Sequence, residues 1–365
     1  MGSDPKGQWA EIRAALDKAD DALVQALDLR ARVVKEFLSL REQDPDNFYT
    51  TPNLAEVMAR VKDAVVDFPR PSLEPVMREI LSACDALIRP VRVGFIGAAG
   101  GLPHLAASRH FGSSADFQSF DTAPALVAEI ARGEISFGVV PLETSTDGAV
   151  TATLDALAHS DAKICAEITI PSAYHLVSRT GNASDIEKIY GAPAAHAACD
   201  RTLRKAFPKA SVLDVPSGAI AAQFASDDHG AAAISTELMV ATHNFKVVLQ
   251  DIQDRSGVHV RYAIVGTELP RRTGTDRTIL AVAVNDSPGA LYKALRPFAD
   301  RGVNLTRLES RPAHGETWRY LFFIELDGHV TDRTVLTAIA DLRDAARWSK
   351  ILGSYPRPPQ EGPSK

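Results

Sequence analysis

Residues 1–88 carry a helical pattern that no strand-like segment interrupts. Residues 9–43 place apolar side chains at helical spacing and contain neither glycine nor proline. Two shorter helices are expected over residues 54–66 and 72–87, the second with Ser72 as its N-cap. Three such helices bury too little apolar surface to form a core alone. We therefore expect an all-α unit over residues 1–89 that pairs with a second copy of itself.

At Pro90 the pattern changes to short apolar segments that alternate with helical ones. The segments VRVGFIG at 91–97, FGVVPL at 137–142 and RYAIVG at 261–266 are strand-like. Short apolar strands between helices are typical of a parallel α/β sheet that is covered on both faces. Residues 90–268 are long enough for two small α/β lobes with a cleft between them.

The C-terminal part of the chain has a third pattern. After the polar linker TELPRRTGTDRT (267–278), the segments read strand, helix, strand, strand, helix, strand. This βαββαβ order over residues 277–356 predicts a small ferredoxin-like domain. Residues 357–365 are polar and proline-rich, and we expect them to be disordered. The expected fold class is thus multidomain, with all-α, two-lobed α/β and ferredoxin-like parts in that order.

The composition excludes several classes of protein. A net charge of −6 argues against a surface made for nucleic acid or acidic membranes, and no apolar run is long enough to span a bilayer. The N-terminus lacks the apolar core of a signal peptide. Cys84, Cys165 and Cys199 are far apart, which favours reduced thiols in the cytoplasm over disulfides. No His/Cys group has zinc spacing, so we expect no metal.

The segment VGFIGAAGG (93–101) resembles a phosphate-binding loop, because glycines after a strand can bind phosphates at a helix start. However, its glycines are spaced GxxGxxGG rather than GxGxxG, and Pro103 follows directly. No acidic residue ends a second strand at the expected distance. We therefore expect no nucleotide, and no other cofactor.

The segment GVVPLETSTDGAV (138–150) is more specific. A strand leads into Glu143, Thr144 and Ser145, which follow at its carboxyl end, where ligands bind open α/β sheets. An ordinary capping box before the next helix has the same residue types. Both interpretations stay open from the residues alone.

The segment SPGALYKALRPFADRGVNLTRLESRP (287–312) combines two features. Residues 288–291 open a helix whose free N–H groups can receive a carboxylate, and ESRP (309–312) ends the following strand. A plain helix start and a turn would account for the same residues.

These segments occur in a recognisable order. Together with VVLQDIQD (247–254), WRYLFFIELDGH (318–329) and LGSYP (352–356), they make the chain resemble, end to end, the bifunctional chorismate mutase–prephenate dehydratase proteins of phenylalanine biosynthesis. The resemblance implies a helical mutase domain of intertwined-dimer type and a dehydratase domain similar to periplasmic binding proteins. It also implies a C-terminal ACT domain that binds phenylalanine as a feedback inhibitor, in a homodimer or homotetramer. The family's phenylalanine-binding motifs match this chain at Gly289, Ala290, Leu291, Glu309, Ser310, Arg311 and Pro312.

The chain departs from the family at the dehydratase site. Where the family has Thr-Arg-Phe, it has Val260, Arg261 and Tyr262. The reaction expels carbon dioxide and a hydroxyl group, and the hydroxyl needs a proton donor that valine cannot supply. Arg261 can still hold a substrate carboxylate bidentately. Of the family's Glu-Asn-Ser, Glu143 and Ser145 remain.

Other positions around the expected cleft have lost polar groups as well. The family's Gly-Pro-Glu-Gly-Thr-Phe-Ser has become residues 97–103, GAAGGLP, and its following motifs have become residues 191–196 and 217–219. His196 and His259 are remaining groups that could move protons, together with Glu143.

The mutase site shows similar losses. By resemblance, its anion-binding groups fall on Arg13, Arg30 and Arg41, whereas the expected glutamate and glutamine are Leu54 and Ile88. Chorismate rearrangement requires two held carboxylates and a stabilised ether oxygen, and losing one stabilising group costs about 10²–10³ in rate. We therefore expect little or no mutase activity. Solvated helix arginines are an equally good interpretation of the three cations.

Three hypotheses follow for the whole chain. The first is an enzyme that binds a prephenate-like or chorismate-like dicarboxylate and has impaired or redirected dehydratase chemistry. The second is a non-catalytic regulator that senses phenylalanine. The third is a working bifunctional enzyme in which Tyr262 or His259 supplies the missing proton.

Overall fold

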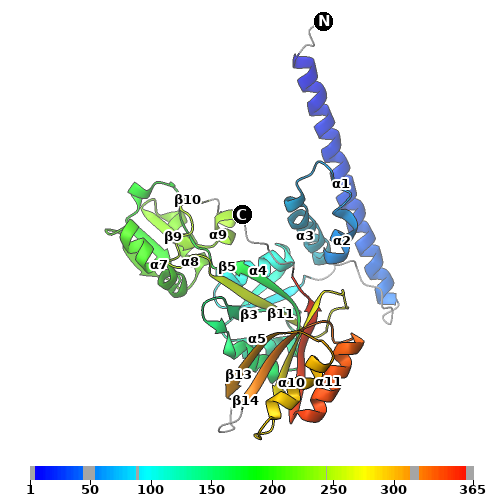
Figure 1. Cartoon of the computed structure of the whole chain (residues 1–365). Coiled ribbons are helices and arrows are strands. Elements are labelled where there is room, and N and C mark those ends of the chain that lie inside the picture. The colour runs from blue at the N-terminus through cyan, green and yellow to red at the C-terminus, as the bar shows by residue number, and fades with distance from the viewer. Residues whose placement is uncertain (1–4, 44–53, 88–89, 244, 313–319, 359–365) are drawn as a thin grey trace. The chain divides into compact units, whose positions relative to one another are not determined.

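The computed structural model describes residues 5–43, 54–87, 90–243, 245–312 and 320–358. The chain divides into two compact units (Figure 1). Residues 1–91 and 108–116 form the first unit, and residues 92–107 and 117–365 form the second.

The first unit contains the expected helices. They are α1 (Pro5–Gln43), α2 (Leu54–Val61) and α3 (Arg70–Ala86). The helix α2 ends before the expected residue 66, since β-branched Val65 and Val66 precede a turn that leads into Pro69. The prediction of Ser72 as N-cap is wrong: Pro69 has that position, because Pro71 fits the first turn of a helix.

The first unit leaves many apolar side chains of α1 in contact with solvent. Trp9 is 71% exposed, Leu16 60% and Val24 64%, whereas Val34 is buried. A folded monomer seldom exposes so many large apolar groups on one helix. The expected pairing with a second copy would cover them, and it stays a prediction.

The second unit begins with a large lobe, of which residues 108–116 are grouped with the first unit. It contains β1 (Arg92–Ile96), α4 (Leu102–Phe111), β2 (Asp116–Phe120), α5 (Ala123–Ala131), β3 (Phe137–Thr144), β4 (Gly148–Ala149), α6 (Thr151–Ala158), β5 (Lys163–Pro171) and β11 (His259–Gly266). The strands β1 and β3 are parallel, but β11 runs antiparallel to both β3 and β5.

A small lobe lies between β5 and β11 in the chain. It contains β6 (His175–Ser178), the 3₁₀ helix η1 (Ala183–Asp185), β7 (Lys188–Gly191), α7 (Pro193–Ala206), β8 (Ser211–Asp214), α8 (Gly218–Asp227), β9 (Ala231–Ser235), α9 (Glu237–His243) and β10 (Lys246–Leu249). Its sheet has the order β10-β6-β9-β7-β8.

The prediction of parallel sheets in this region is only partly correct. In the small lobe β7 pairs in parallel with β8 and β9, but β6 is antiparallel to β9 and β10. In the large lobe the chain leaves through β5 and returns through β11, and these neighbours must therefore run in opposite directions. The two-lobed α/β architecture itself is confirmed.

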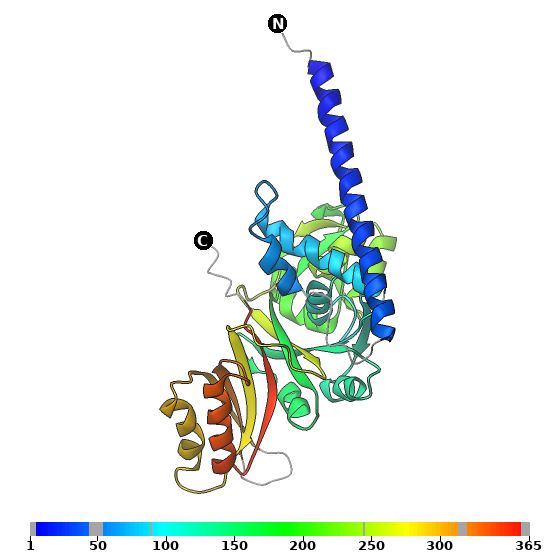
Figure 2. The same cartoon turned by 90° about the vertical axis from the view of Figure 1, so that its right-hand side faces the viewer.

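The C-terminal part has the predicted βαββαβ order. Its elements are β12 (Asp276–Ala283), α10 (Ala290–Asp300), β13 (Leu305–Pro312), β14 (Tyr320–Asp327), α11 (Arg333–Ala345) and β15 (Trp348–Pro356). Figure 2 shows α10 and α11, in gold and orange, side by side on one face of these strands. Residues 359–365 of the expected disordered tail lie outside the described residues.

The C-terminal strands continue the sheet of the large lobe. The order β13-β14-β12-β15-β5-β11-β3-β1-β2 belongs to a 10-stranded sheet, which Gly353 of β15 joins to Ile164 of β5. A Cβ atom at Gly353 would lie 2.5 Å from the Cβ of Ile164, so only glycine permits this junction. One apolar core contains Phe323 and Tyr355 together with Val140 and Leu154 of the large lobe. The C-terminal domain is therefore packed directly on the lobe that carries Glu143 and Ser145.

Two further observations concern the described part of the chain. None of its helices has the length and apolar character that crossing a membrane requires. Among the same residues, no group of three or more His, Cys, Asp or Glu side chains is arranged to hold a metal ion.

Candidate functional site

Ser145 and Val260 lie together where β3 ends and β11 begins. Val260 pairs with Thr144, and Arg261 pairs with Glu143. The N–H of Ser145 donates to the carbonyl of His259 at 2.9 Å, and the N–H of His259 donates to Ser145 Oγ at 3.0 Å. Since Ser145 Oγ only accepts in this contact, its hydroxyl hydrogen can be donated elsewhere. The sequence motifs around residues 145 and 260 thus form one site.

Val260 and Arg261 do not act on the same side of the sheet. Successive side chains of a strand point to opposite faces. Val260 and Tyr262 are buried, 8% and 3% exposed, whereas Arg261 lies on the other face with Glu143. Burial, and to a smaller extent Tyr174, raise the pKa of Tyr262 above its usual value. The Tyr262 hydroxyl therefore keeps its proton at neutral pH.

Each nitrogen of the Arg261 guanidinium donates to a protein carboxylate. Nε reaches Glu167 Oε2 at 2.8 Å, Nη1 reaches Glu143 Oε2 at 3.0 Å, and Nη2 reaches Glu325 Oε1 at 2.8 Å. Burial alone would lower the pKa of Arg261, but Glu167 and Glu325 raise it above its usual value. These contacts use three of the five N–H donors of the guanidinium, and one N–H on each Nη is left for a further acceptor. The arrangement therefore ties Arg261 to the carboxylates of Glu167 and Glu325, and its expected ligand role stays a prediction.

Sequence reasoning missed Glu167 and Glu325. They are only 2% and 8% exposed in their side chains, and each interrupts an apolar strand, in KICAEITI and LFFIELDG. A glutamate in such a strand is rarely fully buried without a partner, so this pattern could have indicated buried ion pairs. The sequence could not show which cation pairs with them, because Arg261 is 94 positions from Glu167 and 64 positions from Glu325.

The ion pairs extend from Arg261 into the C-terminal strands. Arg277 contacts Glu167 and lies 3.7 Å from Glu325. Tyr355 donates to Glu167 Oε2 at 3.0 Å, and burial raises the pKa of Tyr355 well above its usual value. Arg307 contacts Glu143 and lies 3.6 Å from Glu309.

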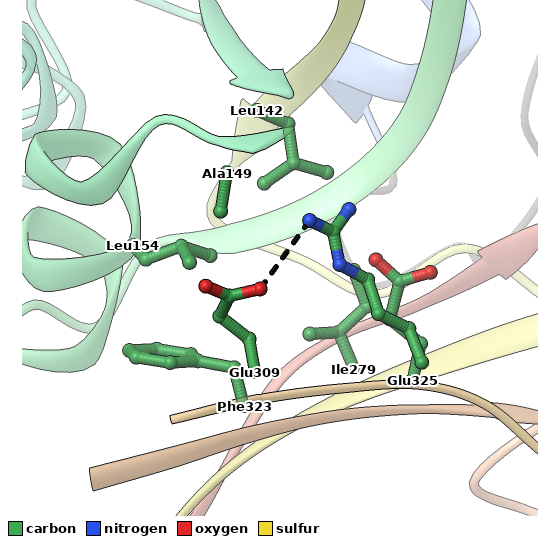
Figure 3. A pocket seen from close by; sticks show the side chains of 8 residues that line it. Leu142, Ala149, Leu154, Ile279, Glu309, Phe323 and Glu325 are labelled. Carbon is green, nitrogen blue, oxygen red and sulfur yellow. Dashed lines mark ion pairs between the residues drawn. The ribbon is translucent and has the colours of Figure 1, made fainter. Parts of the chain in front are cut away.

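Figure 3 shows a small cavity beside these ion pairs, with the carboxylate of Glu309 pointing toward Ala149 and Leu154. The cavity has a volume of about 10 Å³, which is room for about one water molecule. It is too small for an amino acid. Glu309 therefore faces the large lobe and not a phenylalanine-sized space.

The glycine-rich loop joins the two lobes of the second unit through backbone contacts. The Gly100 N–H donates to His104 Nδ1 at 3.1 Å, and its carbonyl accepts from Thr236 Oγ1 at 3.0 Å. The Ala219 N–H donates to the carbonyl of Ala99 at 3.2 Å. His104, which sequence reasoning missed, stacks on Phe95 at 4.6 Å, and burial lowers its pKa. His104 is thus a neutral acceptor that shapes this loop.

The two histidines that the sequence analysis named, His196 and His259, each lie near a polar group of the protein. His196 Nδ1 lies 3.0 Å from Asp214 Oδ1, and its Nε2 lies 3.5 Å from Asp200 Oδ1. His259 Nδ1 lies 3.0 Å from the carbonyl of Gly257. Of the two, only His259 lies in the site that contains Ser145 and Val260.

The residues expected to bind phenylalanine divide between two faces of the C-terminal sheet. Gly289, Ala290 and Leu291 line a pocket of about 260 Å³ at the start of α10, together with Tyr320 and Phe322. Gly289 has φ = +76°, a conformation that glycine adopts readily. Ser310 pairs with Phe322, and so lies near this pocket.

Arg311 makes its contacts in the opposite direction. Its Nη1 lies 2.9 Å from Asp155 Oδ2 and also donates to the carbonyl of Thr151, both on α6 of the large lobe. Within one copy of the chain, Arg311 and Glu309 therefore do not lie with Gly289. The physical reason is the alternation of β13, where every second side chain faces the large lobe. The resemblance implies that all three bind phenylalanine, and this stays a prediction.

In the first unit, Arg30 is the expected anion-binding residue with a spare donor. Its Nη1 is buried without a hydrogen-bond partner in the described residues. Burial raises the pKa of the nearby Asp85, and Arg30 opposes that effect. Arg13 is exposed and 17 residues away on α1, roughly 25 Å along the helix axis. The two can therefore meet at one ligand only if they come from different copies.

The remaining mutase positions are only partly described. Arg41 lies in the last turn of α1, but its side chain lies outside the described residues, and so does Ile88. Leu54 is the first residue of α2.

Family models match the chain in three successive parts. Chorismate mutase type II matches residues 12–88, prephenate dehydratase residues 93–269 and the ACT domain residues 278–344. The bifunctional chorismate mutase/prephenate dehydratase of Aquifex aeolicus (strain VF5) is 32% identical, over 95% of this chain and 97% of its own. This chain belongs to the bifunctional chorismate mutase/prephenate dehydratase family. The expected resemblance is thereby confirmed.

Two further relatives are similar to this chain. The bifunctional chorismate mutase/prephenate dehydratase of Pseudomonas aeruginosa is 30% identical, over 96% of this chain and 98% of its own. The prephenate dehydratase of Arthrobacter aurescens, solved in complex with L-Phe, is 36% identical with a TM-score of 0.62. That structure covers 73% of this chain and 90% of its own.

Membership in the bifunctional chorismate mutase/prephenate dehydratase family accounts for the order of the three domains and for the ACT fold of residues 278–344. The domain boundaries and the roles of individual residues stay predictions. Val260, which stands where the family has a threonine, pairs with Thr144, the residue before Ser145.

Proposed function

We propose that the α/β domain binds a prephenate-like dicarboxylate, that its dehydratase chemistry is impaired or redirected, and that phenylalanine controls it through the ACT domain. The observation that carries this proposal is the buried hydrocarbon side chain of Val260, which stands where the family has a threonine and pairs with Thr144, the residue before Ser145. The proposal also includes a mutase domain with little or no activity.

The chemistry explains why this position matters. When a prephenate-type substrate reacts, the bond to its carboxylate breaks and carbon dioxide leaves. The electron pair moves into the ring, and the departing hydroxyl must take up a proton to leave as water. Losing a positioned donor of this kind costs about 10²–10³ in rate. The hydroxyl of Ser145 is the donor that remains nearby, since its oxygen only accepts from His259.

Phenylalanine control is supported by the pocket at the start of α10. Its lining combines the backbone around Gly289 with the aromatic side chains of Tyr320 and Phe322. Free N–H groups at a helix start suit a carboxylate, and aromatic rings suit a phenyl group. The relative from Arthrobacter aurescens was solved with L-Phe.

A working bifunctional enzyme is the second candidate. It is favoured by the curated relatives, which carry that name and match nearly the whole chain. In this case Ser145, His259 or Tyr262 would supply the proton. A non-catalytic phenylalanine sensor is the third candidate, and it is favoured by the contacts that already occupy Arg261.

The test is incubation of the full-length protein with chorismate and, separately, with prephenate, followed by identification of products by mass. A slow reaction, or a product other than phenylpyruvate, supports the proposal. Rapid formation of phenylpyruvate from prephenate contradicts it and supports the working enzyme. An absence of turnover, together with thermal stabilisation by phenylalanine, supports the sensor.

A further inference from the structure

The strand β13 of the ACT domain has two faces with different contacts. On one face, Ser310 pairs with Phe322, which lines the pocket at the start of α10. On the other face, Arg307 and Arg311 contact the large lobe. Successive side chains of one strand point to opposite faces, so a ligand that displaces β13 from one face also displaces the side chains on the other.

The two arginines contact both ends of one segment of the large lobe. Arg307 pairs with Glu143, two residues before Ser145. Arg311 pairs with Asp155 at 2.9 Å and donates to the carbonyl of Thr151, at the start of α6. Residues 143–151, which we call the Ser145 segment, are therefore held at either end by a single ACT strand.

These contacts are shielded from solvent. Arg311 and Asp155 are 14% and 20% exposed in their side chains. Exposed ion pairs contribute little, but partly buried pairs are screened much less by salt and water. The Arg311 contact also satisfies a backbone carbonyl, which gives it a defined geometry.

The contact of Arg307 is also a shared one. Arg261 Nη1 and Arg307 Nη1 both contact the same oxygen, Glu143 Oε2. If Arg307 moves away, the carboxylate of Glu143 keeps its contact with Arg261 alone of the two arginines. Arg261 belongs to β11, the strand that carries Val260. A small displacement of β13 therefore changes the balance of contacts at Glu143, next to Ser145.

We propose that Arg307 and Arg311 are positioning residues that transmit occupation of the α10 pocket to the Ser145 segment. This rests on the proposed phenylalanine control and specifies its route: Arg311 acts through α6 and Arg307 through Glu143. Arg311 is then a coupling residue and makes no direct contact with the bound amino acid.

The test measures hydrogen–deuterium exchange in peptides that cover residues 142–155, on the full-length protein with and without saturating phenylalanine. Calorimetry measures phenylalanine binding in parallel. In the wild-type chain we expect phenylalanine to change exchange in these peptides by about 5-fold or more. In Arg311→Met we expect phenylalanine to bind within a few-fold of wild type, with the response of residues 142–155 lost.

Matched variants separate coupling from general damage. Arg311→Lys keeps the charge and should retain part of the response. Arg296→Met removes an exposed ion pair with Asp300 from α10 of the same domain and should leave the response unchanged. Asp155→Asn removes the partner from the large lobe without altering the ACT domain, and it should lose the response as Arg311→Met does. If Arg311→Met does not fold, Asp155→Asn still tests the same contact.

Two negative results are distinguishable. If the wild-type chain binds phenylalanine but Arg311→Met and Asp155→Asn respond like wild type, the route is wrong while phenylalanine control stands. If the wild-type chain does not bind phenylalanine, the proposed control fails and the route fails with it.

Discussion

The guanidinium of Arg261 is joined to Glu325 by a contact of 2.8 Å between Nη2 and Oε1. Arg261 belongs to β11 of the large lobe, and Glu325 belongs to β14 of the ACT domain. Arg261, which we expected to hold a substrate carboxylate, is therefore part of the contact between two domains.

Replacing Arg261 should destabilise the protein. In Arg261→Met, the nearly buried carboxylates of Glu167 and Glu325 each lose a cationic partner, and Arg277 is the cation that remains near both. Removal of one partner from a buried ion pair costs about 3–5 kcal/mol in the free energy of unfolding. Urea unfolding of the variant should show this loss, and Arg296→Met, which breaks an exposed pair with Asp300, should change stability little. Normal stability combined with weak substrate binding would instead indicate a ligand role for Arg261.

Val260→Thr should increase dehydratase activity. The change restores the hydroxyl donor of the family's threonine in nearly the same volume, at the residue that pairs with Thr144. Because Val260 is buried, the new hydroxyl should cost some stability, which thermal unfolding of the variant measures. The expected gain in the rate of phenylpyruvate formation is about 10²-fold or more, if no other group limits the reaction. Val258→Thr places the same hydroxyl two residues earlier and is the matched control. No gain in Val260→Thr would mean that the changed loop at residues 97–103 limits the reaction at least as much.

Acidification should weaken the contacts of the glycine-rich loop. His104 accepts the Gly100 N–H through Nδ1, and burial lowers the pKa of His104 below its usual 6.5. As pH falls below 6.5, the imidazole of His104 is therefore protonated in the unfolded chain before it is protonated in the folded chain. The contribution of His104 to stability is fully present above that pH and is lost as pH falls through the lowered pKa. Thermal unfolding between pH 7.5 and 5 should show a smaller dependence on pH in His104→Gln than in wild type.

The exposed apolar side chains of α1 should form a contact between copies. Leu16 and Leu23 are 60% and 57% exposed in the monomer. We expect sedimentation to show at least a dimer, and Leu16→Glu to weaken it by placing a charge in an apolar interface. Val66 is 89% exposed and lies outside α1, so Val66→Glu should leave the assembly unchanged. A wild-type monomer at micromolar concentration would contradict this prediction.

The sequence by itself determined the elements of this protein and their order. The switch at Pro90 from long helices to alternating strands, and the βαββαβ pattern after residue 276, depend on local spacing that any reader of the chain can follow. The lost hydroxyl at Val260 is equally local, because the identity of a side chain decides whether it can donate a proton.

The tertiary structure decided what the charged residues do. Arg261 pairs with a residue 64 positions away and Arg311 with a carbonyl 160 positions away. Which strands become neighbours, and which face of a strand meets another domain, is set by the packing of the whole unit. Local patterns therefore could not show that Arg261, Glu309 and Arg311 face a domain boundary. The sequence gives their identity and position, but not their partners in space.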